Sequence, residues 1–356
     1  MEIRYVDAGL VSGLRSQTIY HALAYAKTPN TPDTIILDIP KDPYVCVGFH
    51  RDVKQEVDIA YCTANKIPII RRETGGGTVY IDENQLFVQW IFGPESLPKM
   101  IDPRFQLFIK PLVETYQAFD INAQFFPPND VHVKAKKIVG TGAAALGLAE
   151  VVTGNFLFDF DCEAMAKVLK VPNEAYREAV YNSLQKYMTS MTKELGSMPD
   201  VEELKAIYIE KCATALERKI VPGDFTDQEY RMMEVLDEKY ATKEWLYQYE
   251  LKQKRKRIVK IHADVWMYEI SHKIRNGTID LVIRTKGKRI DAISIKGDIV
   301  IRPAYKLKAL EKLLHNVEIT EESLSEIVMA FYWLHQVDTP GIVIKDWVEA
   351  IMQAKR

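Results

Sequence analysis

Cysteine is scarce in this sequence, and no two cysteines stand close together. The chain has 356 residues but four cysteines, namely Cys46, Cys62, Cys162 and Cys212, with no Cys-x-x-Cys pair. Zinc sites and disulfide frameworks depend on cysteines at short or regular spacings, so this arrangement argues against both. We therefore expect buried thiols in a reducing, cytoplasmic environment.

Long apolar runs and an excess of one charge are also missing. No apolar stretch approaches the roughly 20 residues of a membrane-spanning helix, and the segment from Met1 to Arg4 lacks the apolar core of a signal peptide. The formal net charge is -2, so no global basic field recruits nucleic acid or an anionic membrane. We expect the protein to bind neither.

The sequence does contain ample material for hydrophobic cores. Hydrophobic residues make up 47% of the 356 residues and charged residues 27%, as in ordinary globular proteins. This length favours two domains, because single cores stop growing at about 250–300 residues. The basic stretch from Lys252 to Arg257 marks the expected boundary, which gives domains of residues 1–248 and 249–356.

Strand-like and helix-like segments are mixed in both parts, which predicts an α+β fold. The strands predicted in the N-terminal part are Thr34–Leu37, Tyr44–Val47, Ile67–Ile70, Leu86–Phe92, Lys137–Val139 and Phe156–Phe160. The helices predicted there are Pro103–Phe119, Cys162–Leu195 with a break at Val171-Pro172, Val201–Arg218 and Thr226–Tyr240. The C-terminal part is predicted to hold strands at Ile258–Ile270, Thr278–Arg284 and Ile290–Ile295, and helices at Tyr305–Leu314 and Glu321–Trp333.

The most informative segment is a glycine triplet, Gly75-Gly76-Gly77, between two β-like runs. It stands in the sequence Arg-Arg-Glu-Thr-Gly-Gly-Gly-Thr-Val-Tyr-Ile-Asp, which covers residues 71–82. Residues without a Cβ let a ligand lie against the main chain, and the exposed N–H groups of such a loop suit an anion. The flanking arginines suit a carboxylate or a phosphate. A triplet alone is equally compatible with a plain turn.

The second informative segment runs from Asn129 to Ala143 and reads Asn-Asp-Val-His-Val-Lys-Ala-Lys-Lys-Ile-Val-Gly-Thr-Gly-Ala. A lysine at the start of a strand can hold its ammonium over a bound phosphate and carbonyl, where carboxylate activation by ATP develops negative charge. Asp130 is a candidate ligand for the Mg²⁺ that accompanies ATP. Taken alone, the lysines at 134, 136 and 137 also fit a solvated charge run.

Together the two segments resemble the motifs of the lipoate–protein ligase A family, in the biotin and lipoate ligase superfamily. The first resembles its Arg-Arg-x-Ser/Thr-Gly-Gly-Gly-x-Val-Tyr/Phe-His-Asp motif, and the second its Asn-Asp…Lys-Ile/Val-Ser-Gly-Ser-Ala motif. A third match at Gly154 to Asp161 resembles the family's His-Gly-Thr-Leu-Leu strand. The agreement in spacing covers roughly the first 245 residues. The C-terminal part resembles the family's accessory domain by order and length.

The resemblance implies mixed sheets with flanking helices and a small C-terminal α+β accessory domain. It makes Lys137 the catalytic lysine, which bridges the acyl carbonyl and the phosphate. It places Arg72 and Asn129 against the adenylate and Asp130 by the phosphate and metal. The other residues that it implies for binding the acyl group or the adenylate are Thr74, Gly75, Gly76, Gly77, Val79, Asp82, Gly140, Thr141, Ala143 and Gly154. Val79 also fits a plain core position, and Asp82 a residue that caps loop hydrogen bonds.

The activity that the resemblance implies is ATP-dependent lipoylation. Lipoate, or octanoate, is activated to an acyl-AMP with ATP and Mg²⁺, and the acyl group passes to a lysine of a lipoyl-domain acceptor protein. We expect one monomeric chain to perform both half-reactions. The sequence departs from the family where Ile81 and Thr153 replace motif histidines, and where Glu83-Asn84-Gln85-Leu86 replaces x-Gly-Asn-Leu after the motif aspartate. These changes leave the phosphate chemistry intact but alter the acyl or nucleotide contacts.

Four alternatives stay open at this level. A cysteine-dependent octanoyl or lipoyl transferase needs a thiolate near the active lysine, and no cysteine follows the lysine strand before Cys162. Biotin ligases contain a Gly-Arg-Gly-Arg adenylate-binding loop, and this motif is absent here. A non-catalytic lipoyl-binding protein would keep the fold. The basic run from Lys252 could bind nucleic acid, serve as a solvated linker, or steer an acidic carrier.

Overall fold

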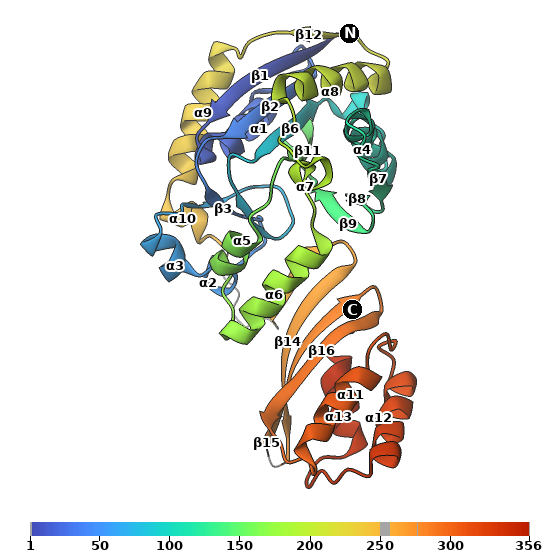
Figure 1. Cartoon of the computed structure of the whole chain (residues 1–356). Coiled ribbons are helices and arrows are strands. Elements are labelled where there is room, and N and C mark those ends of the chain that lie inside the picture. Colours follow the sequence, from blue (N-terminus) through green and yellow to red (C-terminus); the bar gives the residue numbers. More distant parts are fainter. Residues whose placement is uncertain (1, 250–256, 276, 356) are drawn as a thin grey trace. The chain divides into compact units, whose positions relative to one another are not determined.

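The computed structural model describes residues 2–249, 257–275 and 277–355, which form two compact units (Figure 1). The units comprise Met1–Lys252 and Gln253–Arg356. Each unit has its own cluster of buried apolar side chains. Residues 252–256 of the predicted basic boundary lie outside the described residues.

The first unit is built on a mixed six-stranded sheet with the order β10-β11-β6-β2-β1-β12. These strands are β10 (Gly142–Leu146), β11 (Ala149–Leu157), β6 (Gln85–Phe92), β2 (Thr34–Pro40), β1 (Ile3–Val11) and β12 (Ile220–Pro222). Strand β1 pairs in parallel with β2 and β12, and the other pairs are antiparallel. The continuous run Ile35-Ile36-Leu37 is fully buried, because both faces of the sheet are covered.

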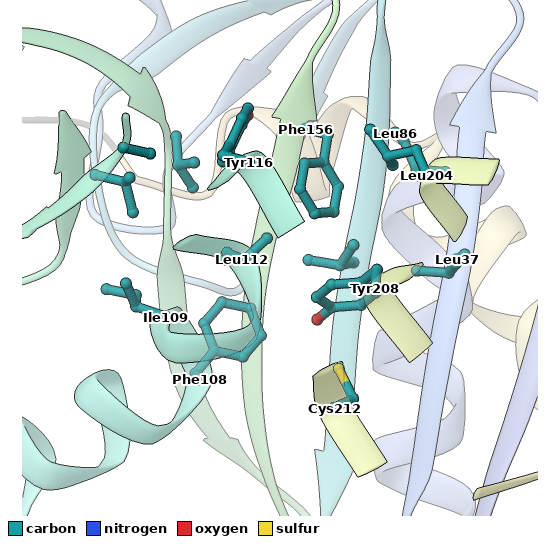
Figure 2. Close-up of a cluster of buried hydrophobic side chains, with 14 of the residues drawn as sticks. Leu37, Leu86, Phe108, Ile109, Leu112, Tyr116, Phe156, Leu204, Tyr208 and Cys212 are labelled. Atoms are coloured by element: carbon teal, nitrogen blue, oxygen red, sulfur yellow. The ribbon is translucent and has the colours of Figure 1, made fainter. Parts of the chain in front are cut away.

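Alternate residues of the central strands serve two separate cores. Ile35 and Leu37 of β2 pack on the side of α4 (Ile101–Ala118) and α8 (Val201–Leu216), as Figure 2 shows for Leu37 and for aromatic residues of both helices. Ile36 packs on the opposite side with α1 (Gly13–Ala26) and α9 (Asp227–Tyr240). The two-residue period of a strand thus fixes one helical layer on each face.

Two small sheets carry the predicted functional segments. The first has the order β4-β3-β5, formed by Ile69–Arg71, Tyr44–Val47 and Thr78–Ile81, and the glycine triplet connects β4 to β5. The second has the order β7-β8-β9, formed by Gln124–Phe126, Asp130–Val133 and Lys136–Val139. The strand that directly follows the triplet is therefore β5. The predicted strand at Leu86–Phe92 is its successor, β6, after a short turn.

Shorter helices complete the first unit. They are α2 (Val53–Glu56), α3 (Ile59–Ala64), η1 (Pro94–Ser96), α5 (Cys162–Val168), α6 (Glu174–Tyr187), α7 (Met191–Leu195) and α10 (Lys243–Leu246). The predicted break at Val171-Pro172 is confirmed, since α5 ends before it and α6 begins after it. The strand predicted at Phe156–Phe160 starts earlier, at Ala149, and ends at Leu157.

The second unit is a four-stranded antiparallel sheet with helices. Its strands follow chain order as β13 (Arg257–His262), β14 (Val265–Ile274), β15 (Gly277–Lys286) and β16 (Arg289–Asp298). Its helices are η2 (Ala304–Lys306), α11 (Leu307–Leu313), α12 (Glu321–His335) and α13 (Ile344–Met352). The single strand predicted at Ile258–Ile270 is wrong, because the chain turns at Ala263-Asp264 and forms the β13–β14 hairpin.

None of the helices in the described ranges combines the length and the apolar character that crossing a bilayer requires.

The turn between β8 and β9 places two non-glycine residues in the left-handed region, Lys134 at φ 49° and Ala135 at φ 68°. Two-residue hairpin turns of this kind favour glycine, because a Cβ destabilises the left-handed region. We expect Ala135→Gly to raise the free energy of unfolding by about 0.5–1 kcal/mol, measured by urea titration. Ala144→Gly, in strand β10 at ordinary φ, should lower it instead, and equal effects of both changes would contradict this reading.

Candidate functional site

The glycine triplet forms a loop whose shape requires glycine at specific positions. Gly76 has a φ of +108°, a region that side chains rarely adopt, and a Cβ there would lie 2.8 Å from Nη2 of Arg72. A Cβ on Gly48, at the end of β3, would lie 2.5 Å from the Gly76 carbonyl oxygen. The loop therefore packs directly against the main chain at the end of β3, and a side chain at position 48 would clash with it.

All four carbonyl groups of residues 74–77 accept hydrogen bonds from the protein. The donors are Phe49 N to Thr74 O (3.2 Å), Arg72 Nη2 to Gly75 O and Gly77 O (2.9 Å each), and Arg51 Nε to Gly76 O (2.9 Å). Across residues 2–249, 257–275 and 277–355, no protein acceptor takes the N–H groups of these four residues. A loop whose carbonyls are bonded and whose N–H groups are not offers donors to an anion.

The two arginines before the loop hold it in place. Arg72 also donates from Nη1 to the Cys46 carbonyl oxygen (3.2 Å) and so ties strand β3 to the loop. Arg71 is fully buried and donates from Nη1 to the carbonyls of Gly48 (3.1 Å) and Phe49 (2.7 Å). The structure gives both side chains a role in shaping the loop, and a contact of Arg72 with the adenylate stays a prediction.

Lys137 lies in β9, in register with His132 of β8. Its Nζ lies 2.8 Å from Oδ1 of Asp130, which is buried. The ring of His132 stacks on Phe126, with centroids 4.2 Å apart. The short hairpin thus holds the ammonium group against a carboxylate, and two residues that the sequence analysis selected form an ion pair.

The remainder of the second segment runs back toward the glycine loop. Asn129 donates from Nδ2 to the Thr141 hydroxyl (3.0 Å), and that hydroxyl donates to the Asn129 carbonyl (2.6 Å). The Gly140 N–H donates to Oδ1 of Asn155 (2.9 Å). A Cβ on Gly142 would lie 3.8 Å from the Thr74 side chain, so β10 begins beside the loop.

Packing or turn geometry accounts for several other predicted residues. A Cβ on Gly154 would lie 3.0 Å from the ring of Phe108, so this glycine packs closely against the core. Asp82 accepts the Asn84 N–H (3.0 Å), and burial raises the pKa of its carboxyl group. Val79 is 39% exposed, and Ala143 is half-buried in β10. Their contacts with substrate stay predictions.

The two positions where the family has histidines hold side chains that serve the fold. Ile81 packs with Tyr44, Cys46 and Ile70 in a small buried cluster. The Thr153 hydroxyl lies 3.5 Å from the carbonyl oxygen of Gly142, its partner across the β10–β11 pair. Neither position offers an imidazole to a ligand.

Sequence reasoning missed the residues that hold the loop from behind. Arg51, which donates to the Gly76 carbonyl, pairs with Glu56 of α2, and Glu56 also accepts the Thr78 hydroxyl, so α2 holds the middle and the far end of the loop. His21 of α1 and Tyr240 of α9 contact Glu73. The available signal was α1 itself, where buried polar residues interrupt an otherwise apolar helix.

The cysteines do not form an activated nucleophile. All four are buried and free. Cys46 is the one near the loop, with Sγ 3.3 Å from Nη1 of Arg72, yet burial raises the pKa of its thiol. Burial also raises the pKa of Cys162. Nucleophilic cysteines have lowered pKa values that keep the thiolate populated, so these environments favour inert thiols.

Comparison with family models and known proteins gives matches in both units. Residues 16–213 match the model "Lipoyl protein ligase A/B catalytic domain", and residues 266–350 match "Bacterial lipoate protein ligase C-terminus". Lipoate–protein ligase 1 of Staphylococcus aureus is 26% identical over 294 residues, which cover 82% of this chain and 84% of the relative. Octanoyltransferase LipM of Kyrpidia tusciae is 24% identical, over 61% of this chain and 87% of the relative.

Solved structures show the same fold. A bipartite lipoate protein ligase of Thermoplasma acidophilum, studied with its E2 lipoyl domain, superposes with a TM-score of 0.64 at 24% identity, covering 71% of this chain and 99% of that one. A lipoate-protein ligase A bound with ATP gives 0.59 at 22% identity, covering 69% and 99%. The α+β architecture is therefore confirmed, and the chain belongs to the lipoyl protein ligase A/B catalytic domain family, with a lipoate protein ligase C-terminal domain following it.

Proposed function

We propose that this protein is an ATP-dependent lipoate–protein ligase. The observation that carries the proposal is the orientation of the glycine loop, which directs its carbonyls into the protein and leaves the N–H groups of residues 74–77 without protein acceptors among the described residues. An acyl-adenylate presents a phosphate and a carbonyl, both of which accept hydrogen bonds. The unbonded N–H groups of the loop can donate to both of these groups of the mixed anhydride.

Lys137 supplies the positive charge in the first half-reaction. A carboxylate oxygen of lipoate attacks the α-phosphorus of ATP, the new oxygen–phosphorus bond forms, and pyrophosphate leaves with the electrons of the broken bond. Negative charge grows on the phosphate oxygens, and a fixed ammonium stabilises it without rearranging. The pairing of Lys137 with Asp130 keeps the ammonium in one place.

Asp130 is the proposed ligand for Mg²⁺. A magnesium ion bound with a nucleotide takes one or two carboxylate oxygens and fills its other positions with water and phosphate, so a single aspartate fits that chemistry. The ion supplies charge neutralisation at the phosphates of ATP. Asp130 holds Lys137 through Oδ1, so this residue would also keep the lysine in place.

The second half-reaction would pass the acyl group to a lysine of a lipoyl domain. The amine attacks the adenylate carbonyl, AMP leaves, and the amine loses a proton to solvent. No covalent enzyme intermediate is required, which agrees with four buried thiols. The Thermoplasma relative is described with an E2 lipoyl domain, which supports this class of acceptor. We infer that the C-terminal unit serves adenylation, and that one monomeric chain performs both steps.

The decisive experiment supplies ATP, Mg²⁺, lipoate and a purified lipoyl domain, and follows pyrophosphate release and the mass of the domain. We expect pyrophosphate release on addition of lipoate and a mass increase of one lipoyl group on the domain. Octanoate in parallel tests the choice of acid. The relationship to an octanoyltransferase defines the rival outcome. Acyl transfer from an acyl-carrier protein without ATP, lost on replacement of Cys46 or Cys162, would overturn the proposal.

A further inference from the structure

A buried histidine lies directly behind the glycine loop. His21, in α1, is fully buried, and its Nδ1 lies 2.5 Å from the main-chain oxygen of Gln17. Its Nε2 lies 3.1 Å from the main-chain nitrogen of Glu73, the residue just before Thr74. A carbonyl accepts and an N–H donates, so the ring must donate from Nδ1 and accept at Nε2. The neutral tautomer with its proton on Nδ1 satisfies both bonds.

The side chain of Glu73 is fixed as well. Its carboxylate accepts the hydroxyl groups of Tyr25 and Tyr240, each at 2.5 Å. Tyr240 stacks on Trp245 with centroids 4.4 Å apart, and the Trp245 indole N–H donates to the Arg71 carbonyl (3.0 Å). The residue that starts the loop is thus held at its main chain by α1 and at its side chain by α1 and α9.

The charged groups around His21 do not change its protonation near neutral pH. Burial lowers the pKa of the imidazole to about 4. The carboxylate of Glu73 acts to raise this pKa, whereas the positive charges of Arg72 and Lys239 act to lower it further. Lys239 lies over the Trp245 ring, 4.4 Å from its centroid. The neutral ring that the hydrogen bonds require is therefore the populated form in the folded protein.

We propose that His21 is a positioning residue for acyl-adenylate formation, acting through the Glu73 N–H to set the orientation of the N–H groups of residues 74–77. It does not touch the substrate. The hydrogen bond from the Glu73 N–H to His21 fixes the orientation of the peptide group at the start of the loop. The arginine contacts to the following carbonyls fix the peptide groups after it. The inference rests on the proposed function, because it assigns the loop to the adenylate.

Two variants separate the bonds of the imidazole. In His21→Gln the side-chain amide reaches the position of Nε2 and can accept the Glu73 N–H, whereas in His21→Asn it reaches the position of Nδ1 and can serve Gln17 alone. We expect the glutamine variant to keep the KM for lipoate in ATP–pyrophosphate exchange within about threefold of wild type. We expect the asparagine variant to raise that KM by about tenfold, the effect of losing one hydrogen bond of about 1.4 kcal/mol.

Hydrogen exchange gives a second readout of the same bond. The Glu73 amide should exchange slowly in wild type and in His21→Gln, and faster in His21→Asn. The comparison between the two variants is made at temperatures equally far below their melting temperatures, so that global unfolding does not cause the difference. If the wild-type protein does not catalyse ATP–pyrophosphate exchange, the proposed function is refuted. Protection of the Glu73 amide from hydrogen exchange would still test the contact with His21. Equal KM and equal protection in both variants would overturn the role of His21.

The protonation of His21 adds a stability test. Its pKa is about 4 in the folded protein and about 6.5 as an ordinary value, so the unfolded chain binds the proton more readily. Stability should therefore fall as the pH falls from about 6.5 to about 4. The melting temperature of His21→Gln should fall less over this range than that of wild type, and parallel curves would contradict a buried neutral ring.

Discussion

Replacement of Lys137 by alanine is expected to lower the rate of lipoyl-adenylate formation by about 10²–10³-fold, the usual effect of removing one preorganised group that stabilises transition-state charge. The ammonium group lies 2.8 Å from Asp130 and is held at one position in the β8–β9 hairpin. Lys137→Arg keeps the charge but changes its geometry, so it should recover part of the rate. ATP–pyrophosphate exchange in the presence of lipoate measures this step without the acceptor domain.

The design must separate lost charge stabilisation from lost folding. Lys137→Ala leaves the buried Asp130 carboxylate without its cation, which is itself destabilising by a few kcal/mol. Adding Asp130→Asn should restore much of the stability and none of the rate. Lys134→Ala is the matched control, because Lys134 lies in the same hairpin with its side chain 84% exposed. A folded Lys137→Ala protein with wild-type exchange would refute the assignment.

Gly76→Ala should impair both folding and adenylate binding. Residue 76 has a φ of +108°, which strains any residue with a Cβ. The new Cβ would also lie 2.8 Å from the Arg72 guanidinium, which donates to the carbonyls of Gly75 and Gly77. We expect a loss of about 1–3 kcal/mol in unfolding free energy from backbone strain. We also expect the affinity for lipoyl-AMP to fall by at least about tenfold, because a displaced Arg72 releases carbonyls that fix the loop. Urea unfolding and calorimetric binding of lipoyl-AMP measure these effects.

Gly75→Ala provides the comparison for this prediction. A Cβ at Gly75 meets nothing within 4 Å, and this glycine does not have a positive φ. Its stability should match wild type, so any loss of lipoyl-AMP binding would report contact with the ligand alone. Equal unfolding free energies for both variants would mean that the observed loop conformation is not the one in solution.

The sequence predicted the family and the mixed architecture, because both depend on local signals. It singled out Lys137 and Asp130 separately, but it did not predict the ion pair between them. The glycine triplet and the lysine strand are short motifs, and Tyr44–Val47 was placed correctly as a strand since it is a β-rich run ended by a glycine. The turn at Ala263-Asp264 was not predicted, because strand-like residues flank it without glycine or proline.

Long-range contacts were beyond the sequence reasoning for a different reason. His21 and Glu73 are 52 positions apart, and Tyr240 and Glu73 are 167 positions apart. Nothing in the local pattern of a histidine in α1 indicates that it meets the main chain of a loop. The packing of Gly154 could not be predicted either, since its close neighbour is the ring of Phe108, which lies in α4, far from β11 in the sequence.

The inward direction of the loop carbonyls also constrains where a cation can reside. Main-chain oxygens are good ligands for hard divalent ions, but those of residues 74–77 already accept bonds from Phe49, Arg51 and Arg72. The guanidinium groups of Arg51 and Arg72, which contact these oxygens, would also repel a metal ion. These carbonyls are therefore poor ligands for the Mg²⁺ of the proposed reaction, and we propose that the carboxylate of Asp130 binds it instead.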